Sequence, residues 1–422
     1  MIYYWYLNEV NAMNPPNSSP RRKTMRRILD YMAIHTEASR STLSEALDLS
    51  PATVTNLVTE LMEKGLLVDG RQTQAAVGRK TTMLRFNAEL RYVLTVSFEK
   101  KNAGGATTDR RLELNICDLL GRSQAHGSDF CDLLVSKTRS ESAILQDLVR
   151  AIRAFLDRQP EALRQKTVAV GVCFNGMVNA DQTVSTAFYN LNNLNLAAPL
   201  QAALGLPVYV DGVTHIKALY EMRFLDPADR NILYLNLSTG IGMAHIYEGK
   251  VLTGRHGIAG EVGHMSLNLF GPPCYCGNRG CFEYYCGTYS LLEQASALLT
   301  PENQNDVFCR LAETQPLTPA LLLQAWEQGS LLISELLRRV ATYLGAALAT
   351  LYNVYDPDRV IIASYLGEGD NALIELAKIE AKSRIVNTFS RDIVISRDHL
   401  QQDQLYLATS AFVLGNILDS LY

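Results

Sequence analysis

The sequence lacks long hydrophobic runs. In 422 residues no apolar stretch reaches the roughly 18–20 residues that a membrane-spanning helix needs, so we expect no membrane insertion. Residues 2–7 are apolar but too few, and no basic stretch precedes them, so a signal peptide is not expected. In a chain without an export signal, the eight cysteines are expected to be reduced thiols of a cytoplasmic protein.

The sequence also has a small net charge of −4, but its basic and acidic residues are distributed unevenly along the chain. Charged residues make up 19% and hydrophobic residues 47%, which is typical of a soluble globular protein, and the length predicts two or three domains. Residues 21–90 contain 11 Lys/Arg against 8 Asp/Glu, and the rest of the chain is acidic. A basic N-terminal module on an acidic body indicates an anionic partner for that module.

One cluster of metal-ligand residues stands out. His264 is followed by Cys274, Cys276 and Cys281, with glycines beside the thiols. One imidazole and three thiols brought together by a tight loop are the donors that tetrahedral zinc prefers. Because all four positions are filled by protein, the predicted zinc is structural, one ion per chain. The alternative is a set of buried cysteines beside an unrelated histidine.

This motif is specific to a family. The pattern Gly-His-x9-Cys-x-Cys-x4-Cys, preceded by the glycine run at residues 238–244, resembles the ROK family of sugar kinases and transcriptional repressors. The resemblance extends from about residue 90 to residue 422. It implies a two-lobed, actin-like ATPase fold with a cleft between the lobes. Strands alternating with helical segments independently favour a mixed α/β fold.

The region before this body has the pattern of three helices and a hairpin. A basic run at residues 21–27 leads into a helical pattern, a second short helix over residues 39–47 carries a serine cap, and a third starts with Ser50 as N-cap and Pro51 as first helical residue. Strand-like segments follow at residues 66–68 and 81–86. This order predicts a winged helix-turn-helix, although a three-helix domain for protein contacts is the alternative.

In a winged helix-turn-helix the N-terminal end of the third helix enters the major groove. The hairpin would place a guanidinium in the minor groove, and many ROK repressors resemble this chain in a Gly-Arg element there. The predicted DNA-binding residues are Ser50, Pro51, Ala52, Thr53, Thr55, Asn56, Arg79 and Lys80.

The predicted division of the chain follows from these two regions. We expect a flexible tail over residues 1–20, the winged helix-turn-helix over 21–87, and the ROK body with its structural zinc loop over 88–422. The first lobe would take about 88–211 plus the C-terminal helix, and the second lobe about 212–404.

The resemblance implies four elements that a working sugar kinase of this family needs, and three are altered. Residues 97–103 contain no Asp-x-Gly-x-Thr phosphate turn, and Val213 stands where the catalytic aspartate is expected. Bulky residues replace the glycines of the adenosine turn at 363–366, and only the loop at 239–242 is retained. We therefore expect no catalytic residues and no enzyme activity, and we interpret the retained glycines as a packing feature.

Part of the sugar site that the family uses is present. Glu261, His264 and Glu283 match residues to which the resemblance assigns sugar hydroxyls, with one His264 nitrogen on zinc and the other toward the sugar. Glu261 and Glu283 could instead only support the zinc loop. The asparagine-aspartate pair is lost at Gly212 and Val213, and Asp211, His215 and the segment 190–192 are the candidates to replace it. The predicted effector-binding residues are Asn190, Asp211, Glu261, His264 and Glu283.

Together these features predict a DNA-binding transcriptional repressor of carbohydrate-related genes. It would bind a palindromic operator as a homodimer or dimer of dimers and respond to a sugar or sugar phosphate in the cleft. Two alternatives remain open: control by a protein partner such as a sugar-transport component, and an active sugar kinase.

Overall fold

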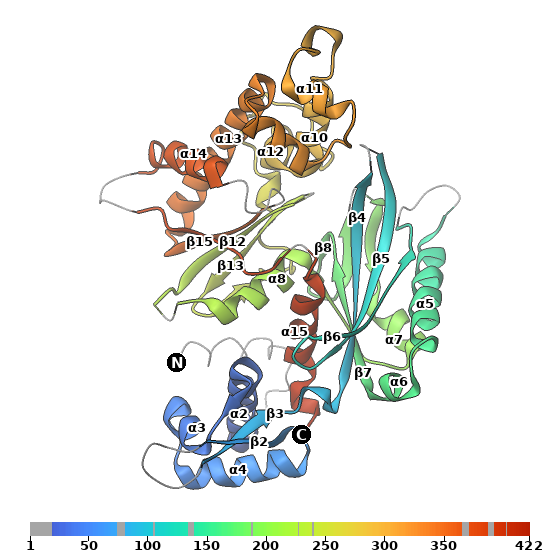
Figure 1. Ribbon diagram of the computed structural model, residues 1–422, viewed down its shortest axis with the longest axis vertical. Coiled ribbons are helices and arrows are strands. Elements are labelled where there is room, and N and C mark those ends of the chain that lie inside the picture. The colour runs from blue at the N-terminus through green and yellow to red at the C-terminus, as the bar shows by residue number, and fades with distance from the viewer. Residues whose placement is uncertain are drawn as a thin grey trace.

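The computed structural model describes residues 19–73, 81–103, 106–133, 139–186, 189–226, 228–238, 240–364, 371–386, 392–401 and 403–422. A small N-terminal unit lies at one end of the molecule, and two lobes, each with its own five-stranded sheet, make up the rest (Figure 1). Within the described residues, no helix combines the length and hydrophobicity of a membrane span.

The N-terminal unit consists of three helices and a three-stranded antiparallel sheet in the order β1-β3-β2. Its elements are α2 (Pro20–His35), β1 (Glu37–Ala38), α3 (Arg40–Leu47), α4 (Pro51–Glu63), β2 (Leu67–Thr73) and β3 (Thr81–Phe86).

Local capping explains where these helices begin. The side chain of Ser39 accepts a hydrogen bond from the Thr42 amide at the start of α3, and Ser50 accepts one from Thr53 at the start of α4. Both predicted helix starts are confirmed. Helix α2 differs from expectation, because Ser19 caps it and it begins at Pro20. The basic run is therefore part of this helix rather than a segment before it.

The first lobe contains a mixed sheet in the order β11-β7-β4-β5-β6. Strands β4, β5 and β6 are antiparallel, whereas β7 and β11 run parallel to β4. Apolar residues of α5 pack on one face and those of α15 on the other. The elements are η2 (Ala88–Leu90), β4 (Tyr92–Ala103), β5 (Ala106–Asp118), β6 (Ser123–Phe130), α5 (Glu141–Asp157), α6 (Glu161–Lys166), β7 (Thr167–Phe174), α7 (Ala197–Leu204), β11 (Val208–Gly212) and α15 (Leu405–Ile417). A small antiparallel sheet is formed by β8 (Met177–Val178), β9 (Thr183–Thr186) and β10 (Leu191–Asn195).

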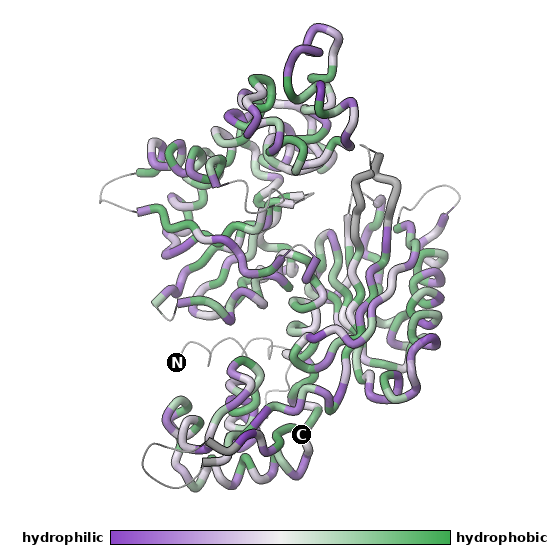
Figure 2. Tube along the Cα trace, in the orientation of Figure 1, coloured by the Kyte–Doolittle hydropathy of each residue, from purple (hydrophilic) through white to green (hydrophobic). Residues whose placement is uncertain are grey.

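The second lobe contains the sheet β14-β13-β12-β15-β16, with α8 packed on one face and α13 on the other. Figure 2 shows hydrophobic residues along the strands of both lobes. Its elements are α8 (Val213–Glu221), η4 (Met222–Phe224), β12 (Asn231–Leu237), β13 (Ile241–Tyr247), β14 (Lys250–Leu252), η5 (Val262–His264), α9 (Phe282–Cys286), α10 (Thr288–Ser296), η6 (Pro301–Asn303), α11 (Val307–Ala312), α12 (Pro319–Glu327), α13 (Leu331–Tyr355), β15 (Arg359–Ser364), α14 (Asn371–Lys382) and β16 (Ile395–Arg397). The final turn of the chain is η8 (Leu418–Ser420).

Helix α15 returns from the second lobe to pack on the first. Gly171 of β7 permits this close approach, because a Cβ atom there would lie 2.3 Å from Val413 Cγ2 and 3.0 Å from Thr409 Cγ2. The same helix shares one hydrophobic cluster with α2 and α4 of the N-terminal unit. Helix α15 therefore joins the N-terminal unit to the body.

We expect Gly171→Ala to destabilise the protein by about 1–3 kcal/mol, because the new methyl group would overpack the contact with α15. Denaturant unfolding would measure the change. Gly212→Ala is the matched control in the same sheet, since its Cβ would meet only Gly176 O at 3.5 Å. Equal stability of Gly171→Ala and wild type would contradict the close seating of α15.

Candidate functional site

Four metal-ligand side chains come together in the second lobe. The ligand atoms of His264, Cys274, Cys276 and Cys281 all lie within 4.8 Å of one another. The Sγ atoms of Cys276 and Cys281 are 3.7 Å apart, and His264 Nδ1 lies 3.8 Å from Cys274 Sγ. Zinc–sulfur bonds of about 2.3 Å in a tetrahedron would separate the ligands by about 3.7 Å. The cluster therefore fits a tetrahedral metal ion.

Close backbone contacts shape the loop that carries these ligands. Gly260 has φ 102° and Gly280 has φ 59°. A Cβ atom would lie 1.9 Å from Met243 O at the first position and 1.8 Å from Asn268 O at the second. Only glycine fits such approaches. These two residues hold the loop against β13 and fold it back on itself, so that His264 meets the three thiols.

The thiols of the cluster would have to lose their protons to bind a metal ion. Burial and the neighbouring sulfur atoms raise the pKa of Cys274 and Cys281 above the ordinary range. Metal ligation requires thiolates, and a dication supplies the positive charge that stabilises them. Binding of a metal to this cluster would therefore release protons.

Glu283 is buried beside the metal cluster and is held by two protein donors. The Ile241 amide donates to Oε2 at 2.8 Å, and the Tyr275 hydroxyl donates to Oε1 at 2.6 Å. A side chain at Gly240 would lie 2.8 Å from the same Oε2. The glycine thus makes room for Glu283. Tyr275, which lies between two of the cysteines, is a site residue that the sequence motif did not identify.

The glycines of the retained loop have a packing role. A Cβ atom at Gly242 would lie 2.7 Å from Thr214 Oγ1 of α8, just as Gly240 accommodates Glu283. Both contacts support the interpretation of these glycines as close-packing positions. Thr239, the threonine of this loop, lies outside the described residues.

Asp211 and His215 form a pair where the chain passes from β11 into α8. Their Oδ1 and Nδ1 atoms are 3.3 Å apart. Burial opposes protonation of His215, but Asp211, the main chain of Ala259 and Glu261 outweigh it and raise the pKa of His215. His215 is one of the residues that the sequence offered as a replacement for the lost asparagine-aspartate pair. Thr214 was not among those candidates, although it directly follows the altered positions Gly212 and Val213.

Four of the five predicted effector residues share one electrostatic environment. Loss of hydration raises the pKa of Glu261, although part of its side chain is exposed. The negative charge of Glu283 raises this pKa further, whereas His264 and His215 lower it. Asp211 joins this group through His215. Asn190 is exposed at the turn before β10, with φ 52°. In this sheet the Asn179 amide donates to Asn193 Oδ1 at 3.0 Å.

The positions at which the sequence was compared with kinase elements lie in β4, at the start of α8 and at the end of β15. Strand β4 continues through residues 97–103, paired with β5. Phe98 is buried with its ring edge against Phe174, at a centroid distance of 5.9 Å. Val213 is the first residue of α8 and packs against the apolar cluster that contains α15. Of the adenosine-turn segment at 363–366, Ala363 and Ser364 end strand β15, and residues 365 and 366 lie outside the described residues.

The predicted DNA-binding residues of α4 lie at its exposed N-terminal end. Ser50, Pro51, Ala52, Thr53, Thr55 and Asn56 are all exposed. The Thr53 and Ser50 hydroxyls are 2.8 Å apart, and the Thr55 hydroxyl donates to Pro51 O. Val54, Leu57, Val58 and Leu61 are buried on the opposite side. Arg79 and Lys80 lie outside the described residues.

Comparison with known proteins decides the family. A model of the ROK family matches residues 127–413. The chain belongs to the ROK family.

The similarity of this ROK protein to named relatives extends over nearly the whole chain. It is 26% identical over 386 residues to the xylose repressor of Bacillus subtilis (strain 168), covering 91% of this chain and 92% of that protein. It is 24% identical over 381 residues to the DNA-binding transcriptional dual regulator NagC of Escherichia coli (strain K12), covering 89% and 88%.

Solved structures show the same fold. A crystal structure of a ROK family transcriptional regulator, described as a homolog of the E. coli MLC protein, has a TM-score of 0.75 and 22% identity and covers 95% of this chain and 98% of that chain. A ROK family glucokinase from Streptomyces griseus has a TM-score of 0.61 and 21% identity, covering 76% of this chain and 98% of its own. The body thus has a sugar-kinase-like ROK fold.

We expect Cys276→Ser to lose most of the bound metal and to loosen the second lobe, because the cluster loses one of its four ligands. Elemental analysis of the purified protein would measure metal per chain, and thermal unfolding would measure the loosening. Cys286→Ala is the matched control, since Cys286 lies five positions after Cys281 and its sulfur contacts Val340 O instead. A full metal complement in Cys276→Ser would contradict this ligand set.

We expect Asp211→Asn to destabilise the protein more at low pH than at high pH. A raised histidine pKa contributes stability that is complete below about pH 6.5 and is lost as the pH rises through the folded-state value. Denaturant unfolding between about pH 6 and pH 9 would measure this difference. In a His215→Asn background the same change should lose its pH dependence. A pH-independent effect in the presence of His215 would refute the pairing.

Proposed function

We propose that this ROK protein is a DNA-binding transcriptional repressor of carbohydrate-related genes, with a non-catalytic body that senses a sugar or sugar derivative. The observation that carries the proposal is a basic N-terminal unit whose capped helix α4 exposes small polar residues, attached to a ROK body. The relatives named as repressors support it. The greater coverage by the regulator structure than by the glucokinase supports it too.

The N-terminal unit is interpreted as a winged helix-turn-helix. Helix α4 would enter the major groove with its N-terminal end, and Asn56 has the amide chemistry for bidentate contact with adenine. Ser50, Pro51, Ala52, Thr53 and Thr55 would surround it, with their hydroxyls or the helix N-terminus toward phosphates. Arg79 and Lys80 would extend into the minor groove from the hairpin of β2 and β3.

The metal is proposed to be zinc with a structural role. The donor set of one imidazole and three thiols favours zinc, and four protein ligands leave no position for an activated water. His264 uses Nδ1 toward the thiols, which leaves its other ring nitrogen for a ligand in the cleft. The metal would then orient a residue of the effector site.

The effector site is proposed to include Asn190, Asp211, Glu261, His264 and Glu283. Their carboxylates, imidazole and amide can hydrogen-bond to sugar hydroxyls. Both Glu283 oxygens already accept protein hydrogen bonds, so Glu261 is expected to offer the freer carboxylate. Sugar binding would alter the closure of the lobes and, through it, DNA affinity.

Kinase activity is not expected. The extended β4, the buried Phe98 and Val213 at the start of α8 together support a body without the phosphate turn or the catalytic base. Control by a protein partner such as a sugar-transport component remains the second candidate. The altered site at Gly212 and Val213 favours it.

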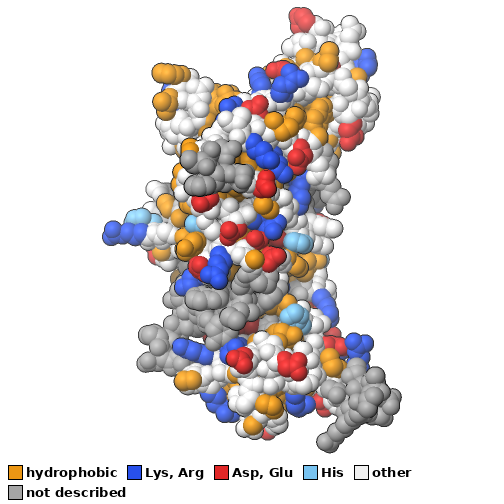
Figure 3. Space-filling view, turned by 90° about the vertical axis from the view of Figure 1, so that its left-hand side faces the viewer, with side chains coloured by type: hydrophobic (Ala, Val, Ile, Leu, Met, Phe, Trp, Pro, Cys, Tyr) orange, Lys and Arg blue, Asp and Glu red, His pale blue; other side chains and the backbone are white. Residues whose placement is uncertain are grey.

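The proposed assembly and location follow from DNA recognition. A two-fold homodimer, or a dimer of such dimers, matches a palindromic operator in which the half-sites lie on the same side of the duplex. The protein would act in the cytoplasm. Figure 3 shows acidic and basic side chains interspersed over one face of the molecule.

The first experiment is fluorescence anisotropy of the full chain on the DNA upstream of its own gene, with and without a panel of sugars and sugar phosphates. A sugar that changes the affinity about 5–150-fold would identify the effector. Tight binding that no sugar changes would favour the protein-partner candidate. Release of ADP from ATP with any sugar would overturn the assignment of a non-catalytic body.

We expect Asn56→Ala to weaken binding by about 1–3 kcal/mol and to relax selectivity at one base pair. Arg79→Ala should weaken binding with its main effect at A/T-rich flanks. Glu63→Ala, at the far end of the same helix, is the control. Unchanged affinity and selectivity in both test variants would refute this DNA-binding surface.

A further inference from the structure

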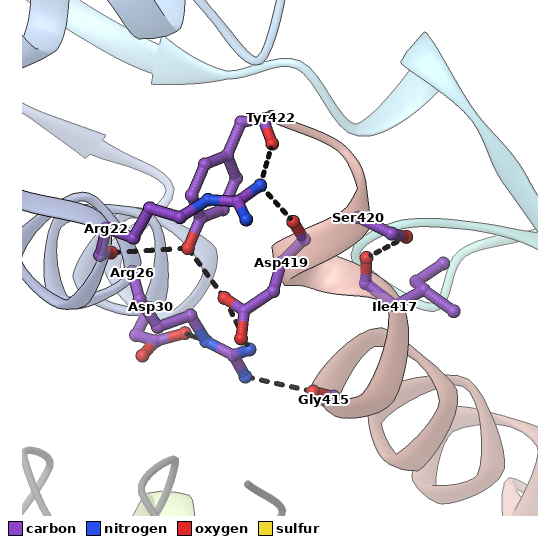
Figure 4. A network of polar contacts seen from close by, with 8 residues as sticks. All are labelled: Arg22, Arg26, Asp30, Gly415, Ile417, Asp419, Ser420 and Tyr422. Atoms are coloured by element: carbon purple, nitrogen blue, oxygen red, sulfur yellow. Dashed lines mark hydrogen bonds and ion pairs between the residues drawn. The ribbon is translucent and has the colours of Figure 1, made fainter. Parts of the chain in front are cut away.

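The C-terminal end of the chain is bound to helix α2 by a polar network, which we call the clasp (Figure 4). Arg22 donates to the main-chain oxygen of Tyr422 at 2.7 Å, and its guanidinium lies 5.6 Å from the centre of the Tyr422 ring. The Tyr422 hydroxyl donates to Asp419 Oδ1 at 2.6 Å. These contacts connect the N-terminal unit directly to the end of α15 and η8.

A buried ion pair forms the centre of the clasp. Arg26 Nε lies 2.8 Å from Asp30 Oδ1 within α2, and these side chains are only 6% and 10% exposed. Across the interface, Arg26 donates to Gly415 O at 3.1 Å and pairs with Asp419 at 3.3 Å. Burial raises the pKa of Asp30 to about 7, although Arg26 opposes this.

Such a network favours one geometry more than it adds stability. A buried ion pair has a high energy in any arrangement that leaves its charges unpaired. In the clasp, Arg26 bonds to a main-chain oxygen of α15 and to the side chain of Asp419. Rotation of α2 on α15 would break these contacts. The clasp therefore fixes the angle between the two helices.

Both helices of the clasp lead to sites described above. Helix α2 shares a hydrophobic cluster with α4, so α4 moves with it. Helix α15 packs on α8, which begins two residues after Asp211. Helix α15 thus contacts α8, beside the Asp211–His215 pair, and also α2, which packs with α4.

We propose that Arg22, Arg26 and Asp419 are positioning residues for operator recognition. By fixing α2 on α15, they set the direction of α4 relative to the body and hence the half-site spacing that a dimer accepts. This inference rests on the proposed function. It assigns no DNA contact to the clasp itself.

The test variant combines Arg22→Ala with Asp419→Ala. The two changes leave the net charge unaltered and retain the Arg26–Asp30 pair inside α2. The matched control combines Arg21→Ala with Glu60→Ala, which removes a 2.6 Å ion pair inside the N-terminal unit and is also charge-neutral. Arg21 neighbours Arg22 on the same helix, so general loss of attraction for phosphates would affect both variants alike.

Two affinities would be measured for each full-length protein: one for a duplex with a single half-site, and one for duplexes with two half-sites at stepwise spacings. The half-site would be taken from the wild-type footprint on its upstream DNA. We expect wild type and control to prefer one spacing by about tenfold, within the range of typical coupling between sites. The clasp variant should keep its single-half-site affinity and lose this preference.

Other outcomes separate the inference from the proposed function. An unchanged spacing preference in the clasp variant, or a wild-type protein indifferent to spacing, would overturn the positioning role alone. A parallel loss of single-half-site affinity and thermal stability would show that the contacts only maintain the fold. Absence of DNA binding by wild type would overturn the proposed function, and this inference with it.

Discussion

The burial of α15 is the constraint on which the rest of the structure depends. This helix is apolar on nearly every side, and all residues from Ala408 to Gly415 are buried. A helix of that kind needs partners around its whole circumference. It finds them in the sheet of the first lobe, in α8 and in the N-terminal unit. Because α15 packs against all three neighbours, it connects the first lobe, the second lobe and the N-terminal unit.

The glycine-rich segment at the start of β13 also connects several parts of the structure. In a kinase such a loop would be read as a phosphate cradle, but here Gly240 and Gly242 accommodate the side chains of Glu283 and Thr214. Glu283 in turn receives the Tyr275 hydroxyl from the metal loop. A motif inherited with the ROK fold thus supports a link between β13, α8 and the metal cluster.

Local signals were sufficient for much of the N-terminal unit and for the metal cluster. Serine caps and Pro51 predicted where α3 and α4 begin, because a cap is satisfied within four residues. The spacing of His264 and the three cysteines predicted a ligand set that the loop brings together. The start of α2 was misplaced, because the basic run gives no apolar periodicity, and the cap at Ser19 was not recognised.

The ROK family, the α/β class and the grouping of His264 with three cysteines could all be predicted from the sequence, since they depend on residue identity and on contacts close along the chain. The contacts that arise only on folding are those of Tyr275 with Glu283, of His215 with Asp211 where β11 passes into α8, and of Arg22 and Arg26 with the end of the chain. Arg22 and Tyr422 are separated by 400 positions and joined by a 2.7 Å hydrogen bond. No periodicity or motif encodes such a contact, because it exists only after α15 has been buried between the lobe and the N-terminal unit.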